Sequence, residues 1–404
     1  MDTLYADVVD LNGQLHVHGV ENITLYSGTG SAGANSVDAG DITGATSLTV
    51  SDLQAADATD LSAVTADLSL TNLAAGVSVA GRDFHHALSI SLAADTGADV
   101  QNIALQAFSA ALTTTNIETV NLTVSEPSDG AATDVDMSAA SGVQHLVLSG
   151  SSGTLNLHLP GGDLAFQDLN ARLVHILDTG LSSLSLKLDN SAAWLQTDSS
   201  LSSLSLDTTG SAGPCSLEMS LSGASSVSVT GTQALGLYVH NQNVDAHTMS
   251  ADLLADAGGS STAVNLTGGT GNDSLDGGDG NDRLDGGGGG TDRLAGNSGA
   301  DIFVFDHAPT GSNVSTITDL ATGTDQLELD HSAFAGLNWS GAPHTLAAGE
   351  FFQGDPNAIS GQHVIFEQGS GNLYYDADGM AGGAQLFATV GAGSDVHNSD
   401  IHIV

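Results

Sequence analysis

The chain has 404 residues, of which 47 are acidic and five are basic, so its formal net charge at pH 7 is −42. This surplus of negative charge argues against nucleic acid and anionic membrane surfaces as partners, and it makes divalent cations the natural counter-charge. With 51 glycines and only 4% aromatic residues, the composition favours thin stacked strands and tight turns over a helical enzyme domain.

Cys215 is the only cysteine, so no intramolecular disulfide can stabilise the chain. We expect bound calcium to stabilise the fold instead of a disulfide. The first residues, MDTLYAD, lack the basic and apolar regions of a secretory signal peptide. No run of about 18 apolar residues predicts a membrane span. A solvated acidic surface is the alternative explanation of the charge.

Short strands are predicted along the first two thirds of the chain, where apolar residues alternate with Ser, Thr or Asn. Alternation with period two is typical of a strand that buries one face. In chain order, these segments are Ile23–Leu25, Leu48–Val50, Leu68–Leu70, Ile90–Leu92, Val120–Leu122, Leu146–Leu148, Leu184–Leu186, Leu204–Leu206 and Val227–Val229.

The spacing of these segments predicts a parallel β-solenoid. Many neighbours lie about 20 to 26 residues apart, near the length of one solenoid coil. An antiparallel sandwich is the alternative, but its hairpin turns of about two to five residues would place strong strands closer together. Helical signals are weak, and one short helix is expected at Gln101–Leu112.

A glycine-rich repeat follows. Residues 268–276 read GGTGNDSLD and residues 277–285 read GGDGNDRLD, and both match the nonapeptide GGxGxDxUx, in which U is a large apolar residue. A third copy, residues 287–295, follows the extra residue Gly286, and residues 296–304 form a degenerate fourth copy. A flexible Gly/Asp linker is the alternative, but the phased apolar residue argues against it.

The sixth position of each nonapeptide supplies a candidate metal ligand: Asp273, Asp282, Asp292 and Asp301. Because two nonapeptides make one coil, alternate repeats should share a site, which pairs Asp273 with Asp292 and Asp282 with Asp301. Each pair is 19 residues apart, because Gly286 is inserted. We therefore expect two calcium ions rather than four.

The other repeat positions complete the predicted site. Glycines permit positive φ and let backbone layers approach closely, so their carbonyls can join the carboxylates in an all-oxygen Ca²⁺ shell. The expected contributors are Gly269, Gly271, Gly278 and Gly280. The eighth positions, which are Leu275, Leu284, Leu294 and Phe303, should fill the inside of the roll.

These repeats resemble the RTX family, whose members are exported by type I secretion. The segments ITDLATGTDQLELD at 317–330, GNLYYDADG at 371–379 and DIHIV at 400–404 look like the family's C-terminal β-domain and uncleaved secretion signal. The strand spacing and the change of repeat predict a parallel β-solenoid at 1–264 and a calcium-binding β-roll at 265–305, and the resemblance implies a β-rich capping and secretion domain at 306–404. The fold class predicted is therefore all-β.

The first two thirds resemble, in composition, the repeat regions of RTX-type bacterial surface-layer proteins. That resemblance implies a structural protein at the cell surface or outside the cell, secreted without an N-terminal signal peptide. Its expected partners are calcium ions, the type I secretion machinery and further copies of itself or a cell-surface glycan. An adhesin or glycan-binding module, and a β-helical polysaccharide lyase or epimerase, remain as alternatives.

Motifs for catalysis are missing. No histidine is followed by glutamate, which excludes HExxH, and there is no GxSxG. The candidate clusters for a lyase or epimerase are 82–86, with His85 and His86, and 238–240, with Tyr238 and His240. His16 and His18 share a strand face, but two ligands make no closed metal site. We therefore expect no enzymatic activity.

Overall fold

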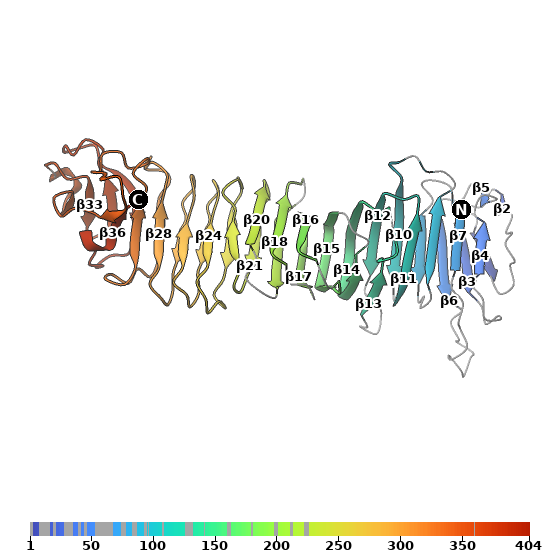
Figure 1. The fold of residues 1–404 in the computed structure, drawn as a ribbon. Helices are drawn as coiled ribbons and strands as arrows, with labels where there is room; N and C mark the ends of the chain where they lie inside the picture. Colours follow the sequence, from blue (N-terminus) through green and yellow to red (C-terminus); the bar gives the residue numbers. More distant parts are fainter. Residues whose placement is uncertain are drawn as a thin grey trace. The chain divides into compact units, whose positions relative to one another are not determined.

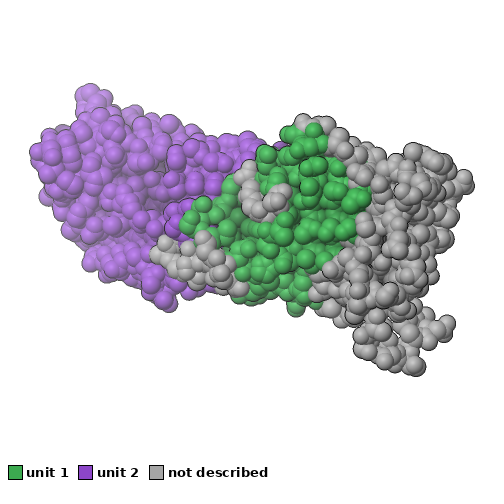
Figure 2. Space-filling view, turned by 45° about the vertical axis from the view of Figure 1, so that its right-hand side comes forward, with its two compact units in different colours: residues 1–200 green, residues 201–404 purple. Residues whose placement is uncertain are grey.

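The computed structural model describes the chain in segments, and every statement below concerns these residues. They are 3–7, 17–18, 22–27, 35–38, 42–43, 47–52, 68–73, 78–82, 87–92, 95, 97–106, 109–125, 132–140, 142–159, 163–178, 181–197, 201–210, 213–221, 226–358 and 360–404. The fold is an all-β parallel solenoid, as the sequence predicts (Figure 1). It divides into two compact units, residues 1–200 and 201–404 (Figure 2).

Unit 1 stacks its strands in two parallel series. One series contains β1 (Thr3–Asp7), β3 (Asn22–Ser27), β6 (Ser47–Asp52), β8 (Ser78–Arg82), β10 (Val100–Gln106) and β12 (Thr119–Ser125). The other contains β4 (Asn35–Asp38), β7 (Leu68–Leu73), β9 (Leu88–Leu92), β11 (Ser109–Thr115) and β13 (Thr133–Asp136). β2 (Val17–His18) and β5 (Ile42–Thr43) pair separately.

The last strands of unit 1 join the two series. They are β14 (His145–His158), β15 (Asp163–Ile176), β16 (Ser183–Asp189) and β17 (Ala192–Thr197). The long strand β14 pairs with β12 through its first half and with β13 through its second half.

Unit 2 continues the same architecture with shorter strands. One series is β18 (Ser203–Thr208), β20 (Ser226–Gly231), β22 (Asn243–Asp245), β24 (Asn265–Thr267), β26 (Arg283–Asp285), β28 (Ile302–Phe305), β30 (Gln326–Leu329) and β36 (Ile401–Ile403). The other is β19 (Cys215–Ser220), β21 (Leu235–Tyr238), β23 (Leu253–Asp256), β25 (Ser274–Asp276), β27 (Arg293–Ala295) and β29 (Ser315–Ile317). Parallel pairing runs unbroken past residue 264, where the sequence repeat changes.

A cap of short strands closes the C-terminal end of unit 2. β33 (Val364–Glu367), β34 (Asn372–Tyr375) and β35 (Gln385–Thr389) form an antiparallel meander, β32 (Phe351–Gln353) pairs parallel with β33, and β31 (His344–Thr345) pairs antiparallel with β36. The cap also contains the 3-10 turns η3 (Pro356–Ala358) and η4 (Asn398–Asp400). Phe334 packs edge-on against Tyr375 and Phe387, so aromatic contacts hold this cap together.

A row of apolar side chains in the core of unit 2 follows the strand series that begins with β18. Because the strands are in parallel register, each coil places one inward residue on the next. The row is Leu204, Val227, Val244, Leu266, Leu284, Phe303, Leu327 and Ile401, and all are at most 1% exposed. The nonapeptide residues Leu284 and Phe303 therefore fill the inside of the roll, as expected.

All nine predicted strand segments lie in strands, but one coil contains two of them. Leu48 pairs with Val79 on β8, whereas Leu70 on β7 pairs with Ile90 on β9. The interval from residue 48 to residue 70 therefore crosses from one series to the other and is not a coil length. The sequence interval alone did not separate a coil from a half-coil.

The predicted helix at 101–112 is wrong, because this segment contributes to β10 and β11 instead. In β10, Gln101, Ile103 and Leu105 are buried while Asn102 and Ala104 are exposed, which is a period of two. β10 is hydrogen-bonded on both sides, to β8 and β12. Backbone pairing on two sides outweighs a weak local helical preference.

The alternation on β23 can be tested with two adjacent leucines. Leu253 is 1% exposed and Leu254 is 38% exposed. We expect Leu253→Ala to lower the free energy of unfolding by about 2 to 3 kcal/mol, near the lower end for Leu→Ala because a thin coil can relax around the gap. Leu254→Ala should cost less than about 0.5 kcal/mol. Denaturant unfolding in calcium measures both, and equal losses would contradict this inside–outside assignment.

Among the described residues, no helix is long and apolar enough to span a bilayer.

Candidate metal centre

Each of the four predicted aspartates directly precedes a short strand, at the corner of the coil where the turn meets the strand. On the side of β26, the corner residue is Val264 in one coil, Asp282 in the next and Asp301 after it. On the side of β25, Leu253 is followed by Asp273 and Asp292. On each side, the aspartates therefore stack on an apolar residue that holds the same position in the preceding coil. All four aspartates are at most 3% exposed.

The expected pair Asp282 and Asp301 lies on adjacent coils. The backbone N–H of Asp282 donates to Oδ1 of Asp301 at 2.8 Å, and that of Val264 donates to Oδ1 of Asp282 at 2.8 Å. The Oδ2 atoms of both aspartates are buried and have no hydrogen-bond partner. A buried carboxylate oxygen without a donor is costly, so each is open to a cation.

The second expected pair, Asp273 and Asp292, is joined in the same way. The backbone N–H of Asp273 donates to Oδ1 of Asp292 at 3.0 Å. Asp273 itself accepts from the N–H groups of Leu253 and Gly269, both at 2.7 Å. The structure therefore brings together the partners that the 19-residue spacing predicts.

Burial raises the pKa of all four carboxyl groups. Desolvation is the largest cause in each case, and neighbouring aspartates add repulsion. The pKa of Asp292 rises to about 7 and that of Asp301 to about 6. Among the described residues, no lysine or arginine forms an ion pair with these carboxylates; Arg283 instead forms a two-bonded pair with Glu328, at 2.6 and 2.7 Å.

The predicted glycine ligands lie in the tight turns beside these carboxylates. The carbonyl oxygens of Gly269 and Gly278 accept hydrogen bonds from Gly288 and Ser298 of the next coil, at 3.0 and 3.2 Å. A β-carbon added at Gly299 would lie 1.5 Å from the carbonyl oxygen of Gly280, and one at Gly290 would lie 1.8 Å from that of Gly271. Only glycine permits such close stacking of turns.

Asp325 extends the column, and the sequence analysis did not select it. Its Oδ1 accepts the N–H of Asp301 at 3.0 Å, and its Oδ2 accepts that of Ala321 at 2.7 Å. It is 3% exposed, and burial raises its pKa. The signal was present in the sequence, since GTDQL at 323–327 keeps the Gly-x-Asp-x-Leu spacing of the nonapeptide.

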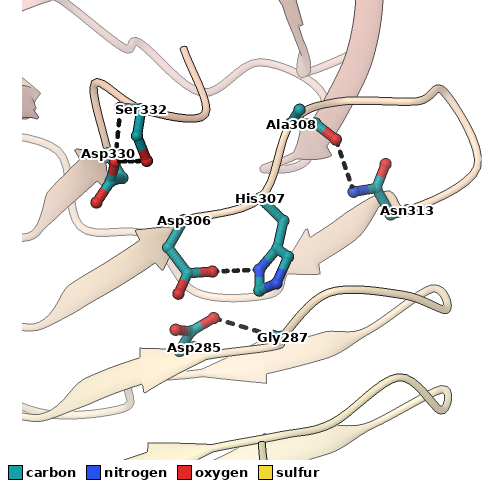
Figure 3. Close-up of polar contacts among 8 residues, drawn as sticks. All are labelled: Asp285, Gly287, Asp306, His307, Ala308, Asn313, Asp330 and Ser332. Carbon is teal, nitrogen blue, oxygen red and sulfur yellow. Dashed lines mark hydrogen bonds and ion pairs between the residues drawn. The ribbon is translucent and has the colours of Figure 1, made fainter. Parts of the chain in front are cut away.

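A second acidic position lies beside the roll, at the end of β26. Figure 3 shows the carboxyl groups of Asp285 and Asp306 close together, with Nδ1 of His307 in ion-pair contact with Asp306. Desolvation, followed by repulsion from Asp306, raises the pKa of Asp285 to about 6. Asp285, Asp306 and His307 line a small pocket with Phe305 and Phe387.

The other candidate residues are described only in part. His16, His85 and His86 lie outside the described residues, and of Arg82 and His18 only the backbone is described, in β8 and β2. Tyr238 and His240 are exposed on either side of the buried Val239. In unit 1, Asp95, Asp99 and Glu118 place one oxygen each within 4.8 Å of one another, and Glu118 accepts the N–H of Asp99 at 2.8 Å.

The ligand atoms at these corners indicate which kind of ion they could bind. The corners offer carboxylate and carbonyl oxygens and no nitrogen or sulfur, a donor set that suits a hard cation such as Ca²⁺. The chain matches no family model, no curated protein and no solved structure. The assignment of a function therefore rests on the residues of these corners.

Proposed function

We propose that the chain is a secreted, calcium-binding repeat protein of the RTX type with a structural role at the cell surface. One observation carries the proposal: stacked, buried aspartates meet in pairs across adjacent coils, and no lysine or arginine in the described part of the chain forms an ion pair with them. Buried carboxylates of this kind are stable when they are protonated or when they bind a cation.

Calcium would couple folding to location. At low calcium, the charge of −42 makes the chain repel itself and opposes compaction, which keeps it competent for type I export. At the millimolar calcium found outside cells, Asp273 with Asp292 and Asp282 with Asp301 would each hold an ion, together with carbonyls of the turns. Since a preformed site does not exist in the unfolded chain, binding free energy becomes folding free energy.

The structural role rests on the form of the solenoid. A stack of coils with Ser-rich and Thr-rich outer faces presents a repetitive surface for contacts between copies. Self-association or retention on a cell-surface glycan would both be compatible with it. Calcium-dependent light scattering separates the two, because a monomeric adhesin would fold without forming larger particles.

The assignment of the ligands can be tested within one nonapeptide. Asp282 is 1% exposed at the sixth position, whereas Asp279 is exposed at the third. We expect Asp282→Asn to weaken calcium binding at its site by about tenfold or more, because the amide keeps the size but removes the charge. Asp279→Asn should leave binding within about twofold. Isothermal titration calorimetry on the full chain measures both, and equal affinities in the two variants would refute the assignment.

A further inference from the structure

A carboxyl group in the C-terminal cap has an oxygen without a partner. Asp376 follows β34 and opens the connection to β35, which spans residues 376–384. It is 1% exposed. Its Oδ1 accepts the N–H groups of Asp378 and Gly379, at 3.1 and 2.8 Å, while its buried Oδ2 has no hydrogen-bond partner. Such an atom is rare and needs a physical explanation.

The protein supplies no cation for this oxygen. No lysine or arginine occurs in the sequence after Arg293. The nearest histidine along the neighbouring strand, His363, has its Nδ1 2.7 Å from the main-chain oxygen of Asp376, so that nitrogen is occupied by a carbonyl. A bound cation would supply the partner that this oxygen lacks.

The unpartnered oxygen faces into its own loop. A β-carbon added at Gly383 would lie 3.2 Å from Oδ2 of Asp376, so a side chain at this position would crowd the oxygen. Asp378 lies exposed on the same loop, and its Oδ1 accepts the N–H of Met380 at 2.9 Å. Gly379 and Gly382, both at positive φ, turn the chain within this loop.

We propose that the loop 376–384 is a separate calcium site, in which Asp376 and Asp378 bind the ion together with main-chain carbonyls. Calcium prefers six to eight oxygen ligands, and this loop offers two carboxylates and backbone oxygens and contains no histidine or cysteine. The site uses no residue of the nonapeptides. It would fix the β34–β35 connection on the cap independently of the roll.

Terbium luminescence distinguishes this site from the roll. Tb³⁺ replaces Ca²⁺ in oxygen sites and emits when a nearby tyrosine is excited, and Tyr374 and Tyr375 directly precede Asp376. We expect the chelator-treated full chain to show tyrosine-sensitised emission that added Ca²⁺ displaces. Asp376→Asn should reduce this emission at a fixed Tb³⁺ concentration at least about fivefold, because it removes the charge of the principal ligand.

Two further variants keep the test valid if the Asp376→Asn protein fails to fold. Gly383→Ala places a methyl group before Oδ2, and Asp378→Asn alters an exposed ligand, so both should reduce emission while the far-ultraviolet circular dichroism stays unchanged. Asp355→Asn is the matched control, since Asp355 is an exposed aspartate whose Oδ1 accepts the N–H of Asn357 in the same cap. It should leave emission unchanged.

The experiment distinguishes a missing calcium site in the loop from missing calcium sites in the roll. Asp282→Asn should leave the tyrosine-sensitised emission in place, because that residue lies in the nonapeptides. Absence of emission from the unmodified chain, or equal emission from the Asp376→Asn, Gly383→Ala and unmodified proteins, would overturn the proposed loop site without bearing on the roll.

Discussion

Adding calcium to chelator-treated protein should produce a sharp gain in β-structure near millimolar concentration, accompanied by growth of larger particles. A ligand that binds only the folded state stabilises it by RT ln(1 + [L]/Kd), which is about 2.7 kcal/mol per site when calcium is at about 100 times Kd. Two such sites contribute about 5 kcal/mol, comparable to the whole stability of many domains. Circular dichroism and light scattering during one titration measure both responses.

The control for this titration is magnesium. Mg²⁺ prefers a smaller octahedral shell and retains its waters, so it should not replace calcium at equal concentration. Folding with calcium but without larger particles would support a monomeric adhesin in place of a surface assembly. No response to calcium at all would remove the basis of the proposed function.

Without calcium, unit 2 should lose stability as the pH rises from about 4 to about 7. Burial raises the pKa of Asp292 to about 7 and that of Asp301 to about 6, above the ordinary aspartate value of 3.8. A carboxyl group with a raised pKa favours folding while it is protonated, and this stabilisation disappears as the pH passes its folded pKa. One pKa unit corresponds to about 1.4 kcal/mol, and since the groups interact and share solvent screening, we expect a combined loss of about 3 to 5 kcal/mol.

Calcium should reverse this dependence, because the ion binds the ionised carboxylates and competes with protons. Denaturant unfolding at several pH values, with chelator and then with saturating calcium, measures the two profiles. Asp292→Asn cannot titrate at this position, so it should flatten the chelator profile. A chelated protein that becomes more stable between about pH 4 and about pH 7 would contradict the electrostatics described for these corners.

Sequence patterns alone predicted most of the architecture. Period-two alternation predicted strands such as Leu204–Leu206 and Val227–Val229, and their parallel pairing confirmed a solenoid. The nonapeptide spacing also predicted that Asp282 would meet Asp301, and the two are hydrogen-bonded across adjacent coils. These features are local and repetitive, so a fixed spacing along the chain becomes a fixed position in each coil.

Other features were decided by tertiary contacts. Residues 101–106 and 109–112 form strands because ladders on both sides satisfy their backbone groups, which no local signal reveals. The burial of Oδ2 of Asp376 and the approach of Asp285 to Asp306 depend on contacts with segments outside the nonapeptide repeat, so no fixed spacing predicts them. Burial and electrostatic repulsion are properties of neighbours in space, so sequence determined which residues could bind a cation and the fold determined which of them lack a partner.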